Sequence, residues 1–398
     1  MTPDFDVIVA GGGAGGAAAA CFLVQRGLRV LVVEKARLPR YKACGGAVPR
    51  PVLERFPFTL QDVVRAEPDM ARFVYPGLEP VDVPLPGKPV AMVLRSELDA
   101  RLLAGSGAEV LAGTSVVGVE EGAESVKVHT ALTPSPLAPT EKGARTLTAR
   151  YLVGADGAAS RVARWLGLRG QRTMGGFLAA EVPLEGRPDL EAELGRRALF
   201  AIGAVQHGYA WVFPKGDRLS VGIGRFVPGH VDLRSALHRE MQRLGIPMDG
   251  VALHGHPLSC YQAPPWPWWS ERAQEPLATR RSLLIGDAAG LTDTLIGEGV
   301  RYAIASANLA AQAIAREDLG GYGARVWREI GHSLASCGKV AGLFYRWPRG
   351  CYRLGVRNPA VTGLFVDVLA ERVSYAGMGR RLAAATLAWF AHGRGRQG

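Results

Sequence analysis

Apolar residues near the start of the chain are grouped in two short runs that an alanine-rich stretch separates. Residues 6–10 and 28–33 are rich in valine, leucine and isoleucine, a pattern typical of strands that are buried on both faces. Residues 17–26 between them predict a helix, and a second, long alanine-rich helix is predicted over 303–315. The order strand, helix, strand predicts a parallel α/β unit.

The middle of the chain has shorter apolar runs that alternate with polar residues. They predict an antiparallel sheet with strands over 176–182, 199–206, 208–213 and 219–225. Two proline-rich segments end elements. Residues 133–139 are expected to form an exposed hairpin tip, and residues 264–269, which are rich in tryptophan, to rim a pocket or touch a membrane.

These patterns predict three parts, of which the first is discontinuous in sequence. Residues 71–90 belong either to the first part or to the sheet. The predicted boundaries are 1–165 and 277–330 for the α/β domain, 166–276 for the antiparallel-sheet domain and 331–398 for a helical cap.

Composition excludes a disordered or fibrous protein, because 48% of the 398 residues are hydrophobic and the glycines have no regular period. The net charge is +11, from 47 basic and 36 acidic residues. Most of this excess lies in residues 331–398, which hold nine arginines and one lysine against two acidic residues. Because aromatic residues are mixed with these arginines, the tail indicates a surface for anionic lipid head groups rather than nucleic acid. A basic helical cap that only aids solubility is the alternative.

The five cysteines form no CxxC motif, so neither a zinc framework nor a disulfide scaffold is expected, and a reducing compartment fits best. His254 and His256 lack a third local ligand, so no metal site is expected. Residues 7–24 are uncharged and long enough to suggest a transmembrane span. They are crowded with glycine and alanine and follow Asp4 and Asp6, which favours a soluble nucleotide-binding unit.

A glycine motif, G-x-G-x-x-G, separates the first strand from the first helix. Such glycines let the backbone turn tightly and approach a diphosphate at the helix N-terminus, and an acidic residue after the second strand accepts from ribose hydroxyls. The sequence therefore predicts a Rossmann-type dinucleotide site, although the motif alone does not separate FAD from NAD. The residues expected to contact the cofactor are Gly11, Gly13, Ala14, Gly16, Glu34 and Lys35.

Two distant segments resemble the FAD motifs of flavoprotein hydroxylases and their relatives. Residues 151–164, with Asp156 and Gly157, resemble the Asp-Gly motif, and residues 283–290, with Gly286 and Asp287, resemble the Gly-Asp motif whose aspartate contacts the ribityl chain. The resemblance implies FAD. For Asp156, capping the turn before Ser160 is an alternative that does not exclude contact with FAD.

Three further segments resemble the geranylgeranyl reductase family of FAD-dependent oxidoreductases. They are P-x-x-K-x-C-G-G at 39–46, Y-x-W-x-F-P followed by G-x-G over 209–224, and Gly-Glu-Gly at 297–299. The resemblance extends from the N-terminus past residue 320. It implies a p-hydroxybenzoate-hydroxylase-like fold, α/β overall, with a Rossmann-type FAD domain, an antiparallel-sheet substrate domain and a C-terminal helical region.

The resemblance assigns roles to individual residues. Cys44 is expected to be catalytic, as proton donor, proton relay or shaper of the pocket, and its alternative is a buried small residue. Arg95 is expected near the FAD phosphates, and its alternative is an exposed arginine that opens a helix. The other flavin-site residues are Gly45, Gly46, Asp156, Gly157, Gly286, Asp287, Gly297, Glu298 and Gly299, and the substrate residues are Tyr209, Trp211, Phe213, Gly222 and Gly224. Without the resemblance, the three aromatic residues would be interpreted as sheet core.

The implied activity is reduction of C=C double bonds in an isoprenoid chain, carried by a lipid or a quinone, by hydride from reduced FAD. NADPH or another low-potential donor would reduce the flavin. The protein is expected in the cytoplasm, at the inner face of the membrane, and its oligomeric state is not predicted. Residues 292–295 depart from the family, because they lack the usual proline. The redox tuning of the flavin or the geometry of the bound substrate is therefore not predicted from the family.

Other functions share this fold. An aromatic or lipid hydroxylase would carry the same FAD motifs, whereas a halogenase would carry a W-x-W-x-I-P segment that the chain lacks. A third alternative is a non-enzymatic escort of prenylated proteins, against which the intact glycine motif, Asp156 and Asp287 argue.

Overall fold

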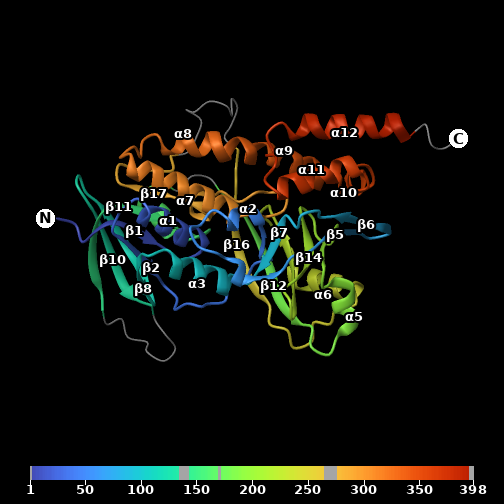
Figure 1. The fold of residues 1–398 in the computed structure, drawn as a ribbon, viewed down its shortest axis with the longest axis horizontal. Coiled ribbons are helices and arrows are strands. Elements are labelled where there is room, and N and C mark those ends of the chain that lie inside the picture. The colour runs from blue at the N-terminus through green and yellow to red at the C-terminus, as the bar shows by residue number, and fades with distance from the viewer. Residues whose placement is uncertain (1, 134–142, 169–171, 264–275, 394–398) are drawn as a thin grey trace.

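Two seven-stranded sheets lie side by side, and helices from the last third of the chain lie along one side of both (Figure 1). The computed structural model describes residues 2–133, 143–168, 172–263 and 276–393. The proline-rich segment 264–269 and most of the expected hairpin tip, 134–139, lie outside the described residues.

The first sheet is built around parallel strands, in the order β8-β2-β1-β11-β10-β9. The end of β11 pairs in parallel with β17, and its beginning pairs antiparallel with β10. Alternate residues of β1 enter two separate hydrophobic clusters, Val7 and Val9 one and Ile8 the other, which explains the continuous apolar run. The strands are β1 (Phe5–Ala10), β2 (Val30–Glu34), β8 (Glu109–Ala112), β9 (Thr114–Glu121), β10 (Val126–Leu132), β11 (Arg145–Gly154) and β17 (Ser282–Leu284).

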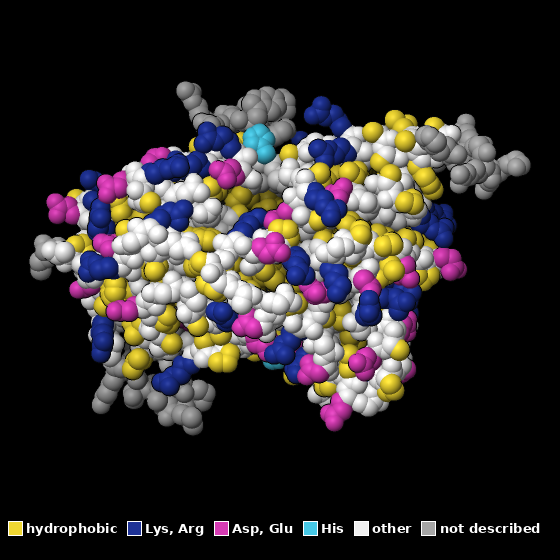
Figure 2. All heavy atoms as spheres, in the orientation of Figure 1, with side chains coloured by type: hydrophobic (Ala, Val, Ile, Leu, Met, Phe, Trp, Pro, Cys, Tyr) yellow, Lys and Arg dark blue, Asp and Glu magenta, His cyan; other side chains and the backbone are white. Residues whose placement is uncertain are grey.

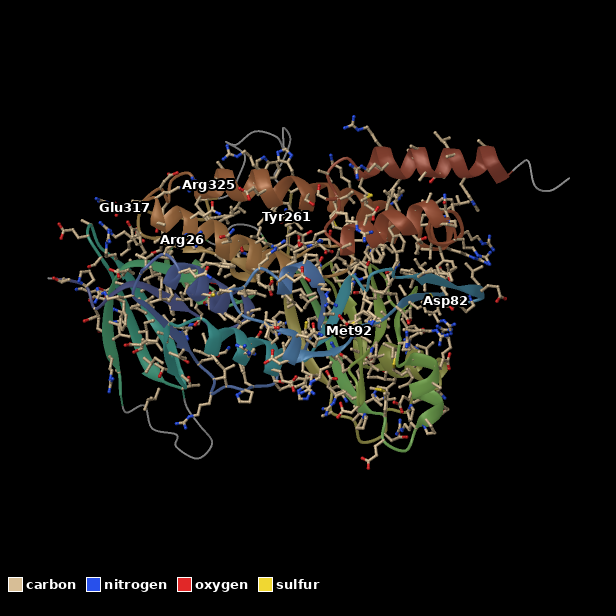
Figure 3. The ribbon with its side chains drawn as sticks, viewed as in Figure 1. Arg26, Asp82, Met92, Tyr261, Glu317 and Arg325 are labelled. Carbon is tan, nitrogen blue, oxygen red and sulfur yellow. The ribbon has the colours of Figure 1, made fainter. Side chains whose placement is uncertain are left out.

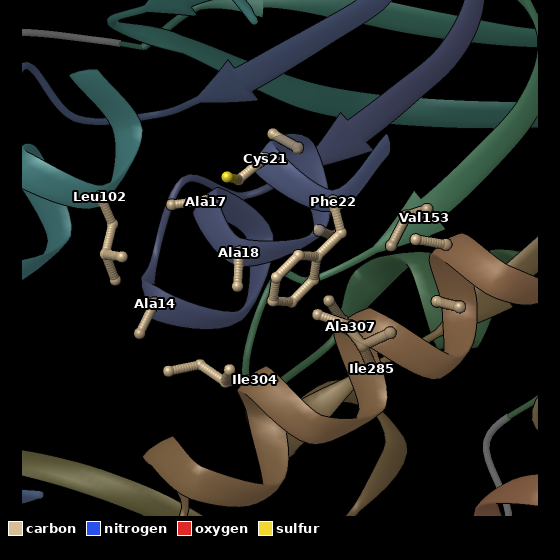
Figure 4. Packing of buried hydrophobic residues seen from close by; sticks show 14 of the residues in the cluster. Ala14, Ala17, Ala18, Cys21, Phe22, Leu102, Val153, Ile285, Ile304 and Ala307 are labelled. Carbon is tan, nitrogen blue, oxygen red and sulfur yellow. The ribbon is translucent and has the colours of Figure 1, made fainter. Parts of the chain in front are cut away.

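Helix α1 (Ala14–Val24) packs against α7 (Val300–Ala315) through small side chains. Figure 4 shows Ala18 and Phe22 of α1 opposite Ala307 of α7. The predicted helix starts three residues late, because the glycine motif continues into the helix and extended Gly13 is the N-cap. Short side chains allow the two helices to approach closely, and a Cβ on Gly15 of α1 would lie 3.1 Å from Ala303 of α7, so their N-terminal ends lie side by side.

The second sheet has the order β16-β12-β15-β14-β13-β5-β6 and is antiparallel except between β13 and β5. One face packs on α5 (Pro188–Leu194) and α6 (Leu233–Arg243), and the other carries aromatic residues. All four predicted strands are present. The strands are β5 (Met70–Tyr75), β6 (Leu78–Pro84), β12 (Thr173–Pro183), β13 (Arg197–Ile202), β14 (Gly208–Pro214), β15 (Arg218–Arg225) and β16 (His254–Cys260).

A three-stranded sheet joins the two large ones. Its order is β3 (Ala47–Pro49), β7 (Val90–Val93) and β4 (Val64–Ala66). The loop that holds Cys44 leads directly into β3, and Arg95 follows β7 at the start of α3 (Arg95–Gly105). Pairing of β3 with β7 therefore brings these two predicted site residues together.

Residues 332–393 are mostly helical, as predicted. Among the described residues, no helix combines the length and hydrophobicity needed to cross a membrane. The remaining helices are α2 (Arg50–Leu53), η1 (Gln61–Val63), α4 (Arg161–Trp165), η3 (Gly286–Ala289), α8 (Tyr322–Val326), η4 (Trp327–Gly331), α9 (His332–Arg346), α10 (Pro348–Cys351), η5 (Tyr352–Val356), α11 (Pro359–Leu369) and α12 (Met378–Gly393).

Candidate active site

A cavity lies where the two large sheets and the small sheet meet, with Met92 of β7 in its wall (Figure 3). Most of the predicted site residues line it, although they come from distant parts of the chain. Those that line it are Gly13, Ala14, Cys44, Gly45, Gly46, Arg95, Gly157, Tyr209, Trp211, Phe213, Gly224, Gly286, Asp287, Gly297, Glu298 and Gly299. Those that are not part of its lining are Gly11, Gly16, Glu34, Lys35, Asp156 and Gly222.

Two guanidinium groups lie at the N-terminus of α1. A Cβ atom on Gly13 would lie 3.7 Å from Arg40 Nη2 and 3.8 Å from Arg95 Nη2. Asp99, which is fully buried, accepts two hydrogen bonds of 2.9 Å from Arg95 and lies 3.2 Å from Arg40 Nη1. Arg40 Nη1 is buried without a hydrogen-bond partner among the described residues. Cations at a helix N-terminus form an anion site, which fits the diphosphate of FAD. Arg95 is 8% exposed, so the alternative of an exposed arginine is wrong.

The other glycines of the motif are required by close backbone approaches. Gly11 has φ +109°, and a Cβ on Gly16 would collide with the Gly11 carbonyl oxygen. Glu34 is buried at the end of β2, where it accepts hydrogen bonds from the backbone N–H groups of Gly12 (2.6 Å) and Ala36 (3.0 Å). Each carboxylate oxygen keeps a lone pair for a ribose hydroxyl. Lys35, in contrast, is exposed.

Asp156 is held by local hydrogen bonds. Its Oδ1 accepts from Ser160 Oγ (2.5 Å), and its Oδ2 accepts from the backbone N–H groups of Arg161 (2.7 Å) and Val162 (3.1 Å). The carboxylate therefore caps the start of α4, as the alternative interpretation expects. Contact with FAD stays a prediction for Asp156, while its neighbour Gly157 lines the cavity.

The loop that departs from the family is fixed by its own aspartate. Asp293 Oδ1 accepts hydrogen bonds from the backbone N–H groups of Leu295 (2.9 Å), Ile296 (2.8 Å) and Gly297 (3.2 Å), and Oδ2 accepts from Glu298 (3.3 Å). These bonds hold the loop without the usual proline. Two further bonds anchor it from outside, because Tyr209 Oη donates to the Ile296 carbonyl (2.7 Å) and Tyr345 Oη donates to the Leu295 carbonyl (2.5 Å).

Asp287 of η3 and Glu298 at the end of this loop both line the cavity beside the N-terminus of α7. Thr292 Oγ1 donates to Asp287 Oδ1 at 2.8 Å, which orients that carboxylate. Burial raises the pKa of Glu298 to about 7, although Arg301 lies 2.7 Å away and favours its ionised form. Arg301 also donates to the Val368 carbonyl (2.9 Å) and so ties the loop to the C-terminal helices.

The aromatic residues of β14 form one wall of the cavity. Tyr209 and Trp211 lie opposite Gly224 and Gly222 of β15, and a Cβ on Gly222 would collide with the Trp211 ring. The G-x-G segment therefore leaves space for the aromatic side chains to lie over the neighbouring strand. Trp211 Nε1 is buried and has no hydrogen-bond partner among the described residues.

Cys44 faces the cavity next to this wall. Its Sγ accepts a hydrogen bond of 3.3 Å from the backbone N–H of Gly46, and a Cβ on Gly45 would lie 3.1 Å from the Phe213 ring. The Arg95 guanidinium interacts with the thiol. A cysteine beside cationic groups in a partly exposed position is typical of reactive thiols. The other four cysteines are buried or half-buried.

Sequence reasoning missed several cavity residues, among them the titratable side chains of Lys42 and His256. Burial and the charge of Lys42 lower the pKa of His256 to about 4, so the imidazole is neutral at pH 7. Burial and Arg95 also lower the pKa of Lys42. From sequence, His256 suggests only a metal ligand, and within the described ranges no group of three or more His, Cys, Asp or Glu side chains could hold a metal ion.

A second cavity lies beneath the C-terminal helices and shares part of its wall with the first. Phe200, Tyr209 and Ile296 line both. No charged side chain is among the described residues that line the second cavity, which include Leu343, Phe344, Trp347, Leu354, Phe365, Val368 and Leu382. An apolar chamber of this kind suits a hydrocarbon chain.

Comparison with known proteins points to FAD as the cofactor. A family model described as an FAD binding domain matches residues 4–323. The chain is 30% identical to menaquinone reductase from Mycobacterium tuberculosis (strain ATCC 25618 / H37Rv), over 93% of this chain and 91% of that protein. It is 28% identical to chloroplastic geranylgeranyl diphosphate reductase from Oryza sativa subsp. japonica, over 92% and 78%.

Among solved structures, a geranylgeranyl bacteriochlorophyll reductase-like protein from Thermoplasma acidophilum has a similar fold. The TM-score is 0.73 at 21% identity, and the alignment covers 96% of this chain and 95% of that one. The predicted fold class, α/β overall with a Rossmann-type FAD-binding domain, is confirmed.

Proposed function

Since this chain belongs to the geranylgeranyl reductase-like family of FAD-dependent oxidoreductases, we propose that it saturates C=C double bonds in an isoprenoid chain of a lipid or quinone. Reduced FAD, when bound, supplies a hydride to one carbon of the double bond. The chain's own residues bind the cofactor, position the alkene, exclude water and supply the proton for the other carbon.

The cofactor site follows from the cations and carboxylates already described. Arg40 and Arg95 would hold the diphosphate at the N-terminus of α1, and Glu34 would accept from a ribose hydroxyl. Asp287, oriented by Thr292, would contact the ribityl chain. The N-terminus of α7 at Gly299 and Val300 favours negative charge on the group that lies against it.

Cys44 is the proposed proton donor. It faces the same cavity as the aromatic wall, so an alkene bound against Trp211 and Phe213 can lie beside its Sγ–H. An isolated alkene has no conjugated group to stabilise developing charge, so donor and acceptor must be held close in a dry site. Trp211, Phe213 and Phe200 exclude water from this region.

The observation that carries the proposal is the shared wall between the two cavities. Phe200, Tyr209 and Ile296 line both the predicted flavin site and the chamber, so the two cavities adjoin, and no charged side chain is among the described residues that line the chamber. A prenyl chain that extends past these three residues would place one double bond at Cys44 while the rest of the chain occupies the chamber. An aromatic hydroxylase, the alternative with the same fold, has no need of such a chamber.

Relatives named menaquinone reductase and geranylgeranyl diphosphate reductase support this substrate class. We propose that NADPH or another low-potential donor reduces the flavin. The test is mass spectrometry of lipids from cells with and without the protein. Mass gains in steps of two hydrogens on isoprenoid chains are expected only when the protein is present. Unchanged isoprenoid masses, or gains of single oxygen atoms, would contradict the proposal.

Peripheral membrane binding is the proposed means of reaching such substrates. Leu343, Trp347 and Leu387 are 65%, 56% and 70% exposed, and arginines flank them in sequence. Figure 2 shows hydrophobic side chains gathered over α12 with basic side chains nearby. Exposed apolar groups among cations favour an anionic lipid surface.

The expected result is sedimentation with phosphatidylglycerol vesicles but not with phosphatidylcholine vesicles. Trp347→Glu combined with Leu387→Glu should abolish sedimentation, because a carboxylate replaces each apolar contact. Val231→Glu, at an exposed apolar position before α6, is the matched control and should still sediment. Wild-type protein that remains in the supernatant with both vesicles would show that the surface has another role.

A further inference from the structure

The sheet face that carries the aromatic wall continues beyond the cavity into polar residues near Cys44, whose carbonyl accepts a hydrogen bond of 3.4 Å from Ser220 Oγ. Phe213 lies opposite Ser220 of β15, and Ser220 lies opposite Glu181 of β12. Residues opposite each other in antiparallel strands project to the same face, and Lys215, two positions after Phe213, continues this face. Lys215, Ser220 and Glu181 therefore form a polar row behind the loop that carries Cys44.

Lys215 is almost completely buried, with 1% of its surface exposed. Its Nζ donates to the Val93 carbonyl at 2.8 Å and contacts Gly46, whose backbone N–H donates to Cys44 Sγ at 3.3 Å. In the described part of the chain, no carboxylate forms an ion pair with it. A buried ammonium without an ion-pair partner is costly, which indicates a use other than stability.

Glu181 is the nearest acid in this row. Its Oε2 is buried without a hydrogen-bond partner among the described residues, although part of the side chain reaches solvent. Burial lowers the pKa of Lys215 and raises the pKa of Glu181, and the two charges act on each other. Both shifts bring the two pKa values closer together, which lowers the cost of moving a proton between the groups. Among the described residues, no direct hydrogen bond joins Lys215 to Glu181 or to Cys44, so each transfer would pass through a water molecule.

Other charged groups lie near this row, but they cannot transfer a proton in its place. Arg95 of α3 lies on the cavity side of Cys44, and Arg218 is paired with Asp217 at the turn between β14 and β15. Tyr41 is 47% exposed, and partial burial together with the charges of Glu181 and Cys44 raises the pKa of its hydroxyl to about 12. Guanidinium groups stay protonated in proteins, so neither arginine can pass a proton on.

From this placement we infer that Lys215 and Glu181 form a proton relay that reloads Cys44 after each reduction. The inference rests on the proposed function, in which Cys44 gives its proton to the alkene carbon. The Sγ–H bond breaks as the new C–H bond forms, and a thiolate remains. Lys215 then loses an Nζ–H proton as Sγ–H forms again, Glu181 returns a proton to Nζ, and solvent returns one to Glu181. No electrons are exchanged in these steps.

The test compares the first turnover with later ones. Lys215→Met holoenzyme, reduced with dithionite without oxygen and mixed with a geranylgeranyl lipid, should reoxidise its flavin no more than several-fold more slowly than wild type in the first turnover. Cys44 still carries its proton in this variant, although loss of the ammonium makes it a weaker acid. Later turnovers should be about 100-fold slower, the usual contribution of one acid–base group. Glu181→Gln should show the same pattern, and Arg218→Gln, which removes an exposed cation near the same carboxyl, should not. The relay would be overturned if Lys215→Met slowed the first and the later turnovers equally, or if it slowed neither of them.

A second measurement needs neither substrate nor turnover. The rate at which iodoacetamide alkylates Cys44 at neutral pH, followed by peptide mass spectrometry, should fall several-fold in Lys215→Met, because a nearby ammonium favours the thiolate. Flavin content shows whether the variant is folded. If wild-type protein reduces no prenyl lipid while Lys215→Met still slows alkylation, the proposed function fails and the Lys215–Cys44 coupling stands. Unchanged alkylation in Lys215→Met overturns the coupling, whatever the enzyme does with lipid.

Discussion

Cys44→Ala should retain FAD and lose about 100-fold in the rate of alkene reduction. The thiol lines the cavity without being part of the cation and carboxylate groups expected to hold FAD, so its removal leaves the cofactor site intact. What it removes is the proton donor beside Trp211 and Phe213. Flavin absorbance of the purified variant measures cofactor content, and anaerobic stopped-flow measures the rate of flavin reoxidation by a geranylgeranyl lipid.

Two further variants separate chemistry from packing. Cys44→Ser keeps a side chain that can accept from the Gly46 N–H but is a much weaker acid, so it should be nearly as slow as Cys44→Ala. Cys21→Ala removes a thiol of α1 that is buried in the hydrophobic core, and this variant should reduce alkenes at the wild-type rate. Normal turnover by Cys44→Ala would mean that the catalytic assignment is wrong.

Arg95→Met should weaken FAD binding and destabilise the fold at the same time. The guanidinium supplies charge at the N-terminus of α1 and donates two hydrogen bonds to Asp99, which is fully buried. Loss of a charge-assisted hydrogen bond to phosphate should raise the Kd for FAD about tenfold or more. The partly unpaired Asp99 should cost about 3 kcal/mol of unfolding free energy, the lower end of the usual range because Arg40 still contacts it.

Arg101→Met is the matched control on the same helix. Arg101 pairs with Asp62 at the surface (2.9 Å), so its loss should cost less than about 1 kcal/mol and leave the Kd for FAD unchanged. Fluorescence titration of apoprotein with FAD and thermal unfolding of both variants give the two quantities. Equal FAD affinity in Arg95→Met and Arg101→Met would show that Arg95 has no part in the phosphate site.

The parts of the fold that the sequence predicts well are those set by local patterns. The doubly buried strands β1 and β2 are continuous apolar runs, and β14 and β15 carry motifs whose residues lie opposite each other in the sheet. Helix boundaries are less accurate, because Ala14 is at once the fourth residue of the glycine segment and the first of α1.

The parts of the site that the sequence does not reveal depend on distant segments that meet only in the fold. Arg40 and Asp99 acquire a shared role because the loop after β2 meets α3 at the start of α1. The sequence does not single out Lys215, because its role depends on Gly46, which the pairing of β3 with β7 brings against its Nζ. Asp293 is likewise an unremarkable polar residue until its four backbone donors are seen.

The central claim is that reduced flavin in this protein passes its hydride to an isoprenoid double bond and not to oxygen. The most direct measurement is the return of oxidised-flavin absorbance after the reduced holoenzyme is mixed with a geranylgeranyl lipid in the strict absence of oxygen. We expect the absorbance to return in step with formation of the dihydro product. Flavin that stays reduced until oxygen is admitted, with an oxygenated product, would contradict the account and favour a hydroxylase.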